Sequence, residues 1–257
     1  MFKPLPLFLG LRYSRSRRRN GFIAFISASS LIGIALGVMA LILGPSAMNG
    51  FERELKNRVL SVVPHGELIG MEAPLPDWPR LRDYLLAQPG IEAAAPVIRL
   101  DGLLEHGSAI KGVQVRAVLP ELEANLSDAG NYMTGLGFRE LQAGEHGVIL
   151  GKTIADKLGV KIGDPVTLLL PQGGDETGIK NPRRETLTVV GLLEIGGQLD
   201  GVLGFMHLAD AQSITGMGSA VEGFSLKVND VLKAQSITVA AARKFPHYVY
   251  ISSWMSR

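Results

Sequence analysis

Residues Phe22–Gly44, FIAFISASSLIGIALGVMALILG, form an apolar run without a charged side chain. A helix rises about 1.5 Å per residue, so a run of this length crosses the roughly 30 Å hydrocarbon core of a bilayer. A secretory signal peptide is the alternative, because the small residues Ser46 and Ala47 follow, but its apolar region is shorter, at roughly 7–15 residues. The run therefore predicts one uncleaved transmembrane helix over residues 22–44.

The flanks of this run predict its orientation. Residues 1–21 contain Lys3 and an arginine cluster from Arg12 to Arg19, and no acidic residue. An excess of Lys and Arg on one side places the N-terminus in the cytoplasm and everything after about residue 45 outside. In residues 4–18, PLPLFLGLRYSRSRR, Leu and Phe would face lipid and Arg the phosphates, which predicts an interfacial segment that lies on the membrane. A nucleic-acid interface is the alternative for the cluster, but the adjacent span explains it, and the formal net charge of the chain is only +2.

The stretch after the run, SAMNGFERELKNRVLSVVPHGE at residues 46–67, predicts that the helix continues. Apolar residues recur there every three or four positions, which is one face of a helix: Met48, Phe51, Leu55, Val59 and Val62. Glu52 and Lys56 stand at i,i+4 with the acid first, the favourable order. We predict an amphipathic stalk helix over residues 45–64, ended by Pro64. An ordinary packed helix of the following domain is the alternative.

Residues 65–257 are predicted to form a mixed α+β domain. Alternating apolar residues indicate strands near 66–72, 93–100, 110–118, 147–150, 165–170, 186–194, 202–208, 223–228 and 247–252. Helical spacing indicates helices near 78–88, 152–158, 209–215 and 231–243. Residues 121–139 are the least patterned, and we expect an insertion or a subdomain boundary there. The chain has no cysteine, which excludes disulfides and thiolate sites and is compatible with an oxidising compartment.

Patterns typical of catalysis or metal binding are sparse. The histidines are dispersed and form no H-E-x-x-H pair: His65, His106, His146, His207 and His247. GGQLDGVLG is glycine-rich but lacks the Gly-Lys-Ser/Thr ending of a phosphate-binding loop, and no G-x-S-x-G motif occurs. We therefore expect no catalytic, cofactor or metal site, and we expect ATP turnover to lie on a partner.

Several segments together resemble one family. GLRYSRSRRRNGF, IGIALGV, SAMNGFERELKNRVLSVVPHGE, GQLD, LADAQ and YVYISSW are similar, in order along nearly the whole chain, to the LolC/LolE membrane subunits of the lipoprotein-releasing ABC transporter, and most of all to its LolE branch. The resemblance implies a MacB-like periplasmic domain and an inner-membrane complex that lifts lipoproteins from the outer leaflet. It implies a LolC-like sister permease, a cytoplasmic ATPase, a lipoprotein substrate and a periplasmic carrier protein as partners.

The sequence departs from the family pattern in two ways. Family members carry about four membrane helices, so we expect this chain to correspond to their N-terminal part: interfacial segment, first span and periplasmic domain. Pro45 stands where the family has an aliphatic residue. Proline removes a helical hydrogen bond and favours a kink, so both a straight and a bent helix remain open here.

The resemblance and the spacing together suggest three groups of site residues. Met48, Phe51 and Leu55 are predicted to line a cavity that accepts acyl chains. Gly33 and Gly37 form a small-xxx-small face for helix packing, or else face lipid. Lys180, Arg183 and Arg184 end the loop PQGGDETGIKNPRR, which is either a partner-binding loop or a solvated hairpin. In the LolC branch this region is implied to hold a hook for the carrier, and the lack of an apolar hook here favours the LolE role.

Two other functions remain as alternatives at this point. One is a permease of the MacB or FtsX type, which couples ATP hydrolysis to a periplasmic effector or efflux partner. The other is a membrane-anchored periplasmic binding module.

Overall fold

The computed structural model describes residues 8–10, 12, 21–71, 74–135, 137–171 and 181–253, and it leaves the side chains of residues 23, 24 and 51–60 undescribed. The chain divides into two compact units, residues 1–55 and 56–257. The expected class is confirmed: one apolar N-terminal helix precedes a mixed α+β domain.

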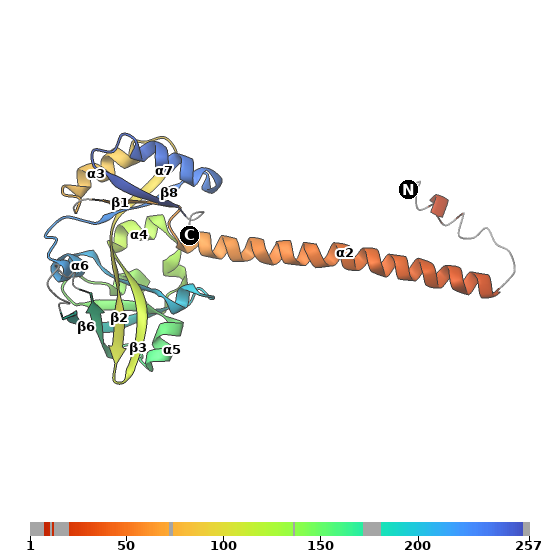
Figure 1. The fold of residues 1–257 in the computed structure, drawn as a ribbon, viewed down its shortest axis with the longest axis horizontal. Helices are drawn as coiled ribbons and strands as arrows, with labels where there is room; N and C mark the ends of the chain where they lie inside the picture. The colour runs from red at the N-terminus through yellow and green to blue at the C-terminus, as the bar shows by residue number, and fades with distance from the viewer. Residues whose placement is uncertain are drawn as a thin grey trace. The chain divides into compact units, whose positions relative to one another are not determined.

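The first long element is helix α2, Gly21–Val62. Residues Phe25–Gly50 within it are long and apolar enough to cross a membrane, with a mean hydropathy of 2.3. Large apolar side chains such as Phe25, Leu31 and Leu41 are more than half exposed in the isolated chain, which is unfavourable in water and favourable in lipid. Pro45 lies inside α2, and the helix is assigned without a break through it (Figure 1).

The domain contains a small antiparallel sheet built from two βαβ units. The first unit is β1 (Gly66–Gly70), α3 (Trp78–Leu86) and β2 (Ile91–His106), and the second is β8 (Gly223–Val228), α7 (Ala234–Ala242) and β9 (Val249–Ser253). The strand order is β9-β1-β8-β2, with each neighbouring pair antiparallel. This is the split βαβ arrangement of a ferredoxin-like sheet. Helices α3 and α7 lie on the same side of it (Figure 1).

The chain between the two units forms a closed ring of strands. Its members besides β2 are β3 (Ala109–Val118), β4 (Gly147–Gly151), β5 (Pro165–Leu170), β6 (Arg183–Leu193) and β7 (Leu203–His207). The pairing runs β2-β3-β7-β4-β6-β5 and returns to β2, because β2 pairs with both β3 and β5. Strand β2 also pairs with β8 through its first half, so one long strand belongs to both the barrel and the small sheet.

Three α-helices pack around the barrel: α4 (Pro120–Leu126), α5 (Lys152–Leu158) and α6 (Leu208–Thr215). Four short 3-10 helices complete the described domain: η1 (Ala129–Tyr132), η2 (Gly137–Glu140), η3 (Leu199–Gly201) and η4 (Val231–Lys233). Residues 121–139, which looked like an insertion, contain α4, η1 and η2. Phe138 packs edge-on against Phe205 of β7 with ring centroids 5.3 Å apart, so this segment belongs to the core of the domain.

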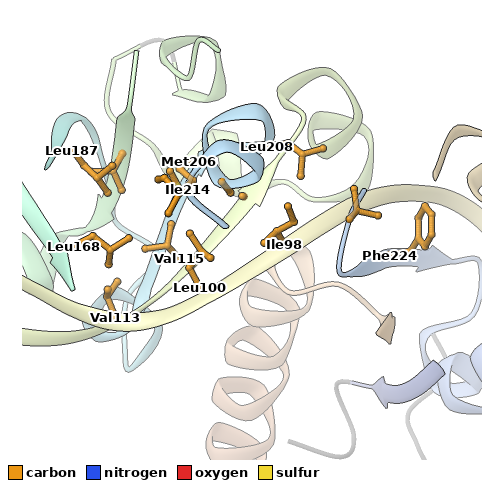
Figure 2. Close-up of a cluster of buried hydrophobic side chains, with 14 of the residues drawn as sticks. Ile98, Leu100, Val113, Val115, Leu168, Leu187, Met206, Leu208, Ile214 and Phe224 are labelled. Carbon is orange, nitrogen blue, oxygen red and sulfur yellow. The ribbon is translucent and has the colours of Figure 1, made fainter. Parts of the chain in front are cut away.

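The main hydrophobic core is continuous from the barrel to the small sheet. Figure 2 shows Val113, Val115, Leu168, Leu187 and Met206 pointing toward one another from four strands of the barrel. The same cluster includes Ile98, Leu68 and Phe224, which bring in β2, β1 and β8. Burying one such side chain stabilises the fold by roughly 1.5–3 kcal/mol. The two sheets therefore share one core.

Gly223 permits the close approach of β8 to β1. A Cβ at this position would collide with the carbonyl oxygen of Leu68 and with Ile69, which lies directly opposite. We expect Gly223→Ala to lower the free energy of unfolding by roughly 1–3 kcal/mol, because the two strands must separate. Gly112 of β3 is the matched control, since a Cβ there meets no atom within 4 Å. Urea denaturation of both variants checks this, and equal midpoints would contradict the close packing.

Candidate functional site

The glycine face predicted on α2 is open in this chain. No atom lies within 4 Å of a Cβ placed on Gly33 or on Gly37. Because helical residues four apart share a face, the two glycines present one flat strip on the segment suited to cross a membrane. The strip is free for either a neighbouring helix or lipid.

Of the predicted acyl-chain wall, formed by Met48, Phe51 and Leu55, the structure describes one side chain. The side chain of Met48 is 72% exposed. Phe51 and Leu55 lie in α2, but their side chains are outside the described residues. Their common face with Met48 therefore stays a prediction from the spacing of three and four residues.

Of the predicted basic loop, residues 171–184, the structure describes Pro171 and residues 181–184. Lys180 lies outside the described residues, whereas Arg183 and Arg184 begin β6. Arg183 Nε donates to Glu185 Oε1 at 2.7 Å, and Arg184 Nη2 donates to Glu105 Oε2 at 3.3 Å. Exposed ion pairs of this kind stabilise the fold by only about 0–1 kcal/mol. The paired carboxylates of Glu185 and Glu105 nevertheless reduce the net positive charge at this end of the barrel.

The last turn of α2 is fixed to the domain. Val62 is buried in the second hydrophobic cluster, which also contains Val118 and Phe205. The backbone N–H of Asp128 donates to the carbonyl of Ser61 at 2.7 Å, and that of His65 donates to Leu226 at 3.0 Å. Packing against β3 and β7, together with hydrogen bonds to β8 and to the α4–η1 segment, therefore holds residues 61–65 in place.

A buried polar network follows directly after this junction. Arg116 of β3, only 3% exposed, donates from Nη1 to Glu67 Oε1 at 2.6 Å and from Nη2 to Ser225 Oγ at 2.7 Å. Arg99 of β2 extends the network, because its Nη2 donates to Glu222 Oε1 at 2.8 Å and its Nη1 lies 3.9 Å from Glu67 Oε2. Buried charges are stable only when they are paired and hydrogen-bonded. The network thus joins the barrel to the small sheet.

This network was not among the sites predicted from the sequence. Its signal was present, because Glu67 and Arg116 are the charged residues of two otherwise mostly apolar segments, GELIG and VQVRAV. Alternation alone places such residues toward solvent. Here the second face of the small sheet is covered by α4 and by β3, so the same positions are buried.

Glu123 on α4 lies beside this network. The carboxyl is buried, its Oε1 accepts a hydrogen bond from Ser127 Oγ at 3.3 Å, and its Oε2 has no partner among the described residues. Burial raises the pKa of Glu123, and the charge of Arg116 and the Ser127 hydrogen bond oppose this shift only in part. Glu123 therefore retains its proton to a higher pH than an exposed glutamate.

Two of the histidines make local structural contacts in the described part of the chain. His207 Nδ1 accepts from the N–H of Ala209 and caps α6, and His106 Nδ1 lies 2.9 Å from the carbonyl oxygen of Pro165. No group of three or more His, Cys, Asp or Glu side chains is placed to hold a metal ion among the described residues.

The chain is similar in sequence to known proteins over most of its length. Residues 27–244 match the MacB-like periplasmic core domain. The chain is 37% identical to the lipoprotein-releasing system transmembrane protein LolE of Haemophilus influenzae, over 98% of this chain and 62% of that protein. It is 38% identical to LolC of Neisseria meningitidis serogroup B, over 91% of this chain and 57% of that protein, and 35% identical to LolC of Xylella fastidiosa, over 99% and 61%. The expected resemblance is confirmed, and the chain spans less than two thirds of these relatives.

Glu123 gives the domain a measurable pH dependence. A carboxyl whose pKa is raised by folding favours the folded state at low pH, and this contribution is lost as the pH rises from the ordinary value of 4.5 through the raised value. Glu123→Gln removes the titration, so the variant should gain stability relative to the wild type as the pH increases, by up to about 1.4 kcal/mol per pH unit.

Denaturation midpoints between about pH 4 and pH 8 check this expectation. Glu121→Gln on the exposed side of the same helix is the control, and its pH profile should run parallel to that of the wild type. A Glu123→Gln profile that also runs parallel would show that the carboxyl does not titrate differently in the two states.

Proposed function

Because the chain belongs to the family that carries the MacB-like periplasmic core domain and is similar along nearly its whole length to LolE and LolC, we propose that it acts in a membrane subunit that releases lipoproteins from the inner membrane. The observation that carries this proposal is the direct join of an apolar, span-length helix to the folded domain, with the similarity covering both.

The proposed topology follows from the charges. Residues 1–21 lie at the cytoplasmic surface, residues 22–44 span the membrane, and residues 45–64 form a stalk outside it. Residues 65–257 are then the periplasmic domain. The arginine-rich flank supports this orientation, as does the family's description as a periplasmic core domain.

ATP hydrolysis is assigned to a separate cytoplasmic partner, and a LolC-like sister permease completes the complex. The chain binds no cofactor in this proposal. The last turn of α2 is packed into the domain through Val62 and hydrogen-bonded through Ser61, which supports a last turn that moves with the domain. Gly33 and Gly37 then form the face on which another membrane helix of the complex packs.

The acyl-chain wall is proposed to lie just above the span. Met48, Phe51 and Leu55 offer a flexible thioether and apolar surface at one side of the stalk. Burying an acyl chain stabilises by about 0.8 kcal/mol per CH₂, so an apolar wall offsets part of the cost of leaving the bilayer. Arg183 and Arg184, with Lys180, are proposed as a secondary contact for a periplasmic carrier protein.

A permease of the MacB or FtsX type would share the helix and the domain. The similarity to LolE and LolC over nearly the whole chain favours lipoprotein release. Membrane topology and lipoprotein release can be tested separately.

Topology is testable because the chain has no cysteine, so one introduced thiol is labelled uniquely. We expect Lys157→Cys, at an exposed position of α5, to react with a membrane-impermeant maleimide in intact spheroplasts. Arg12→Cys should react only after the membrane is opened. Labelling is read by gel shift, and the reverse pattern would overturn the orientation.

Lipoprotein release tests the acyl-chain wall. A carboxylate placed in an apolar wall must be desolvated, so Met48→Asp or Phe51→Asp in the full-length subunit should lower release roughly tenfold while assembly and basal ATPase persist. Asn57→Asp adds the same charge about half a helical turn from this face and is the matched control. Photo-crosslinking to lipoprotein from positions 48, 51 and 57 locates the contact. Equal yields from all three would mean that the stripe does not face the substrate.

A further inference from the structure

Strand β9 is an open edge of the sheet in the described part of the chain. The barrel strands close into a ring, so each of them has a neighbour on both sides along part of its length, although residues 91–97 of β2 pair only with β8. β9 is the last strand of the small sheet and pairs only with β1. An open edge presents unpaired backbone groups to which another strand can add.

The register identifies which backbone groups face outward. The N–H of Met71 donates to the carbonyl of Tyr248 at 3.0 Å, and Ile69 lies opposite Tyr250. In an antiparallel ladder alternate residues point their N–H and C=O groups to the same side, so Tyr250 faces β1 as Tyr248 does. The N–H and C=O groups of Val249 and Ile251 therefore point to the open side.

A groove runs beside this open edge. A hollow of about 490 Å³ is lined from α7 by Val239 and Ala242 and from the strand by Val249 and Ile251. A second hollow of about 500 Å³ continues along α7 and shares Val239 and Arg243 with the first. An edge strand next to a helix, with an apolar floor between them, is the geometry in which domains bind an extended peptide by strand addition.

The charge around the groove is positive. Residues 231–253 include Arg243, Lys244 and His247 and no acidic residue, and Lys233 in the same range is paired with Asp230 at 3.1 Å. Arg243 and Lys244 are exposed, and neither takes part in an ion pair among the described residues. Tyr248 and Tyr250 are also more than half exposed. Cationic and aromatic side chains at an open strand edge fit an acidic, extended segment.

We propose that β9 and α7 form a docking groove for an extended acidic segment of a partner protein, which adds to the small sheet as a further strand beside β9. Apolar side chains of the segment would alternate into the groove, and its carboxylates would meet Arg243 and Lys244. The charges alone would suit anionic lipid as well, but the open backbone groups of Val249 and Ile251 favour a polypeptide. The site does not depend on which substrate the transporter carries.

The test uses the full chain in detergent micelles and a labelled peptide of about eight residues in which Val and Glu alternate. Fluorescence anisotropy should show that this peptide binds, whereas the peptide with Lys in place of Glu does not. Amide exchange followed by NMR gives the geometry: the N–H groups of Val249 and Ile251 should become protected on binding, while that of Tyr250 is protected with or without peptide.

Variants separate the contributions of charge and backbone. Arg243→Glu combined with Lys244→Glu should weaken the peptide roughly tenfold or more, and Lys157→Glu on α5 should not. Ile251→Pro removes one outward N–H and spares the ladder with β1, so it should also weaken binding. If this variant does not fold, the charge variants and the amide-exchange data still test whether the segment binds at β9.

Four outcomes would overturn the proposal. They are no binding of the acidic peptide, equal binding of the basic one, binding that leaves the amides of Val249 and Ile251 unprotected, and binding unaffected by the double variant. Vesicles of phosphatidylglycerol that bind through Arg243 and Lys244 when the peptide does not would assign the surface to lipid instead.

Discussion

The buried ion pair between Arg116 and Glu67 is the interaction on which the arrangement of the domain depends. It connects β3 of the barrel to β1 of the small sheet, and the bond from Arg116 to Ser225 adds β8. Removing one member of such a pair leaves an unpaired buried charge, which costs several kcal/mol, whereas an apolar replacement of the whole set can be neutral. The pair therefore specifies which strands face each other more than it adds stability. Glu67 follows the last turn of α2 by a few residues, so the same contact also positions the junction.

The two faces of the small sheet follow from this arrangement. One face packs under α3 and α7 and is apolar, with Leu68 and Phe224 in the main core. The other lies against α4 and β3 and holds Glu67, Ser225 and Arg116 together with the protonatable Glu123. Strand β2 is common to both sheets, because its first half pairs with β8 and its second half pairs with β3. Closing the barrel in this way gives each of its strands a neighbour on both sides along part of its length, whereas β9 pairs with β1 alone among the described strands.

The sequence predicts most of the secondary structure, for identifiable reasons. The predicted strand segments overlap each of the nine described strands: β5 and β6 alternate between buried and less buried residues, whereas β1, β4, β7 and β8 are short runs that are almost wholly buried. The charge-free run predicted the apolar helix. Strand β2 is longer than predicted, since residues 101–106 of its hairpin with β3 are partly exposed and lack clear alternation. Helix α4 was missed because it is seven residues long and buries Glu123 beside Leu126, so it has hardly any apolar period. Of the candidate sites, Gly33 and Gly37 lie on one helix, and their role in helix packing stays a prediction. The polar network depends on contacts between strands distant in the sequence, which no local pattern contains.

The ladder between β1 and β9 connects the proposed transport role to the proposed groove. Gly66 lies opposite Ser253, so the chain enters the small sheet after α2 and reaches the end of β9 at neighbouring positions. A displacement of the last turn of α2 acts first on β1, which is held by hydrogen bonds to β8 on one side and to β9 on the other. It reaches the barrel through Glu67 and Arg116, and it reaches the groove edge through one strand. Because packed cores resist deformation, these elements are expected to move as one body. A partner bound along β9 would then move with the last turn of α2, because one ladder of backbone hydrogen bonds, between β1 and β9, separates the two.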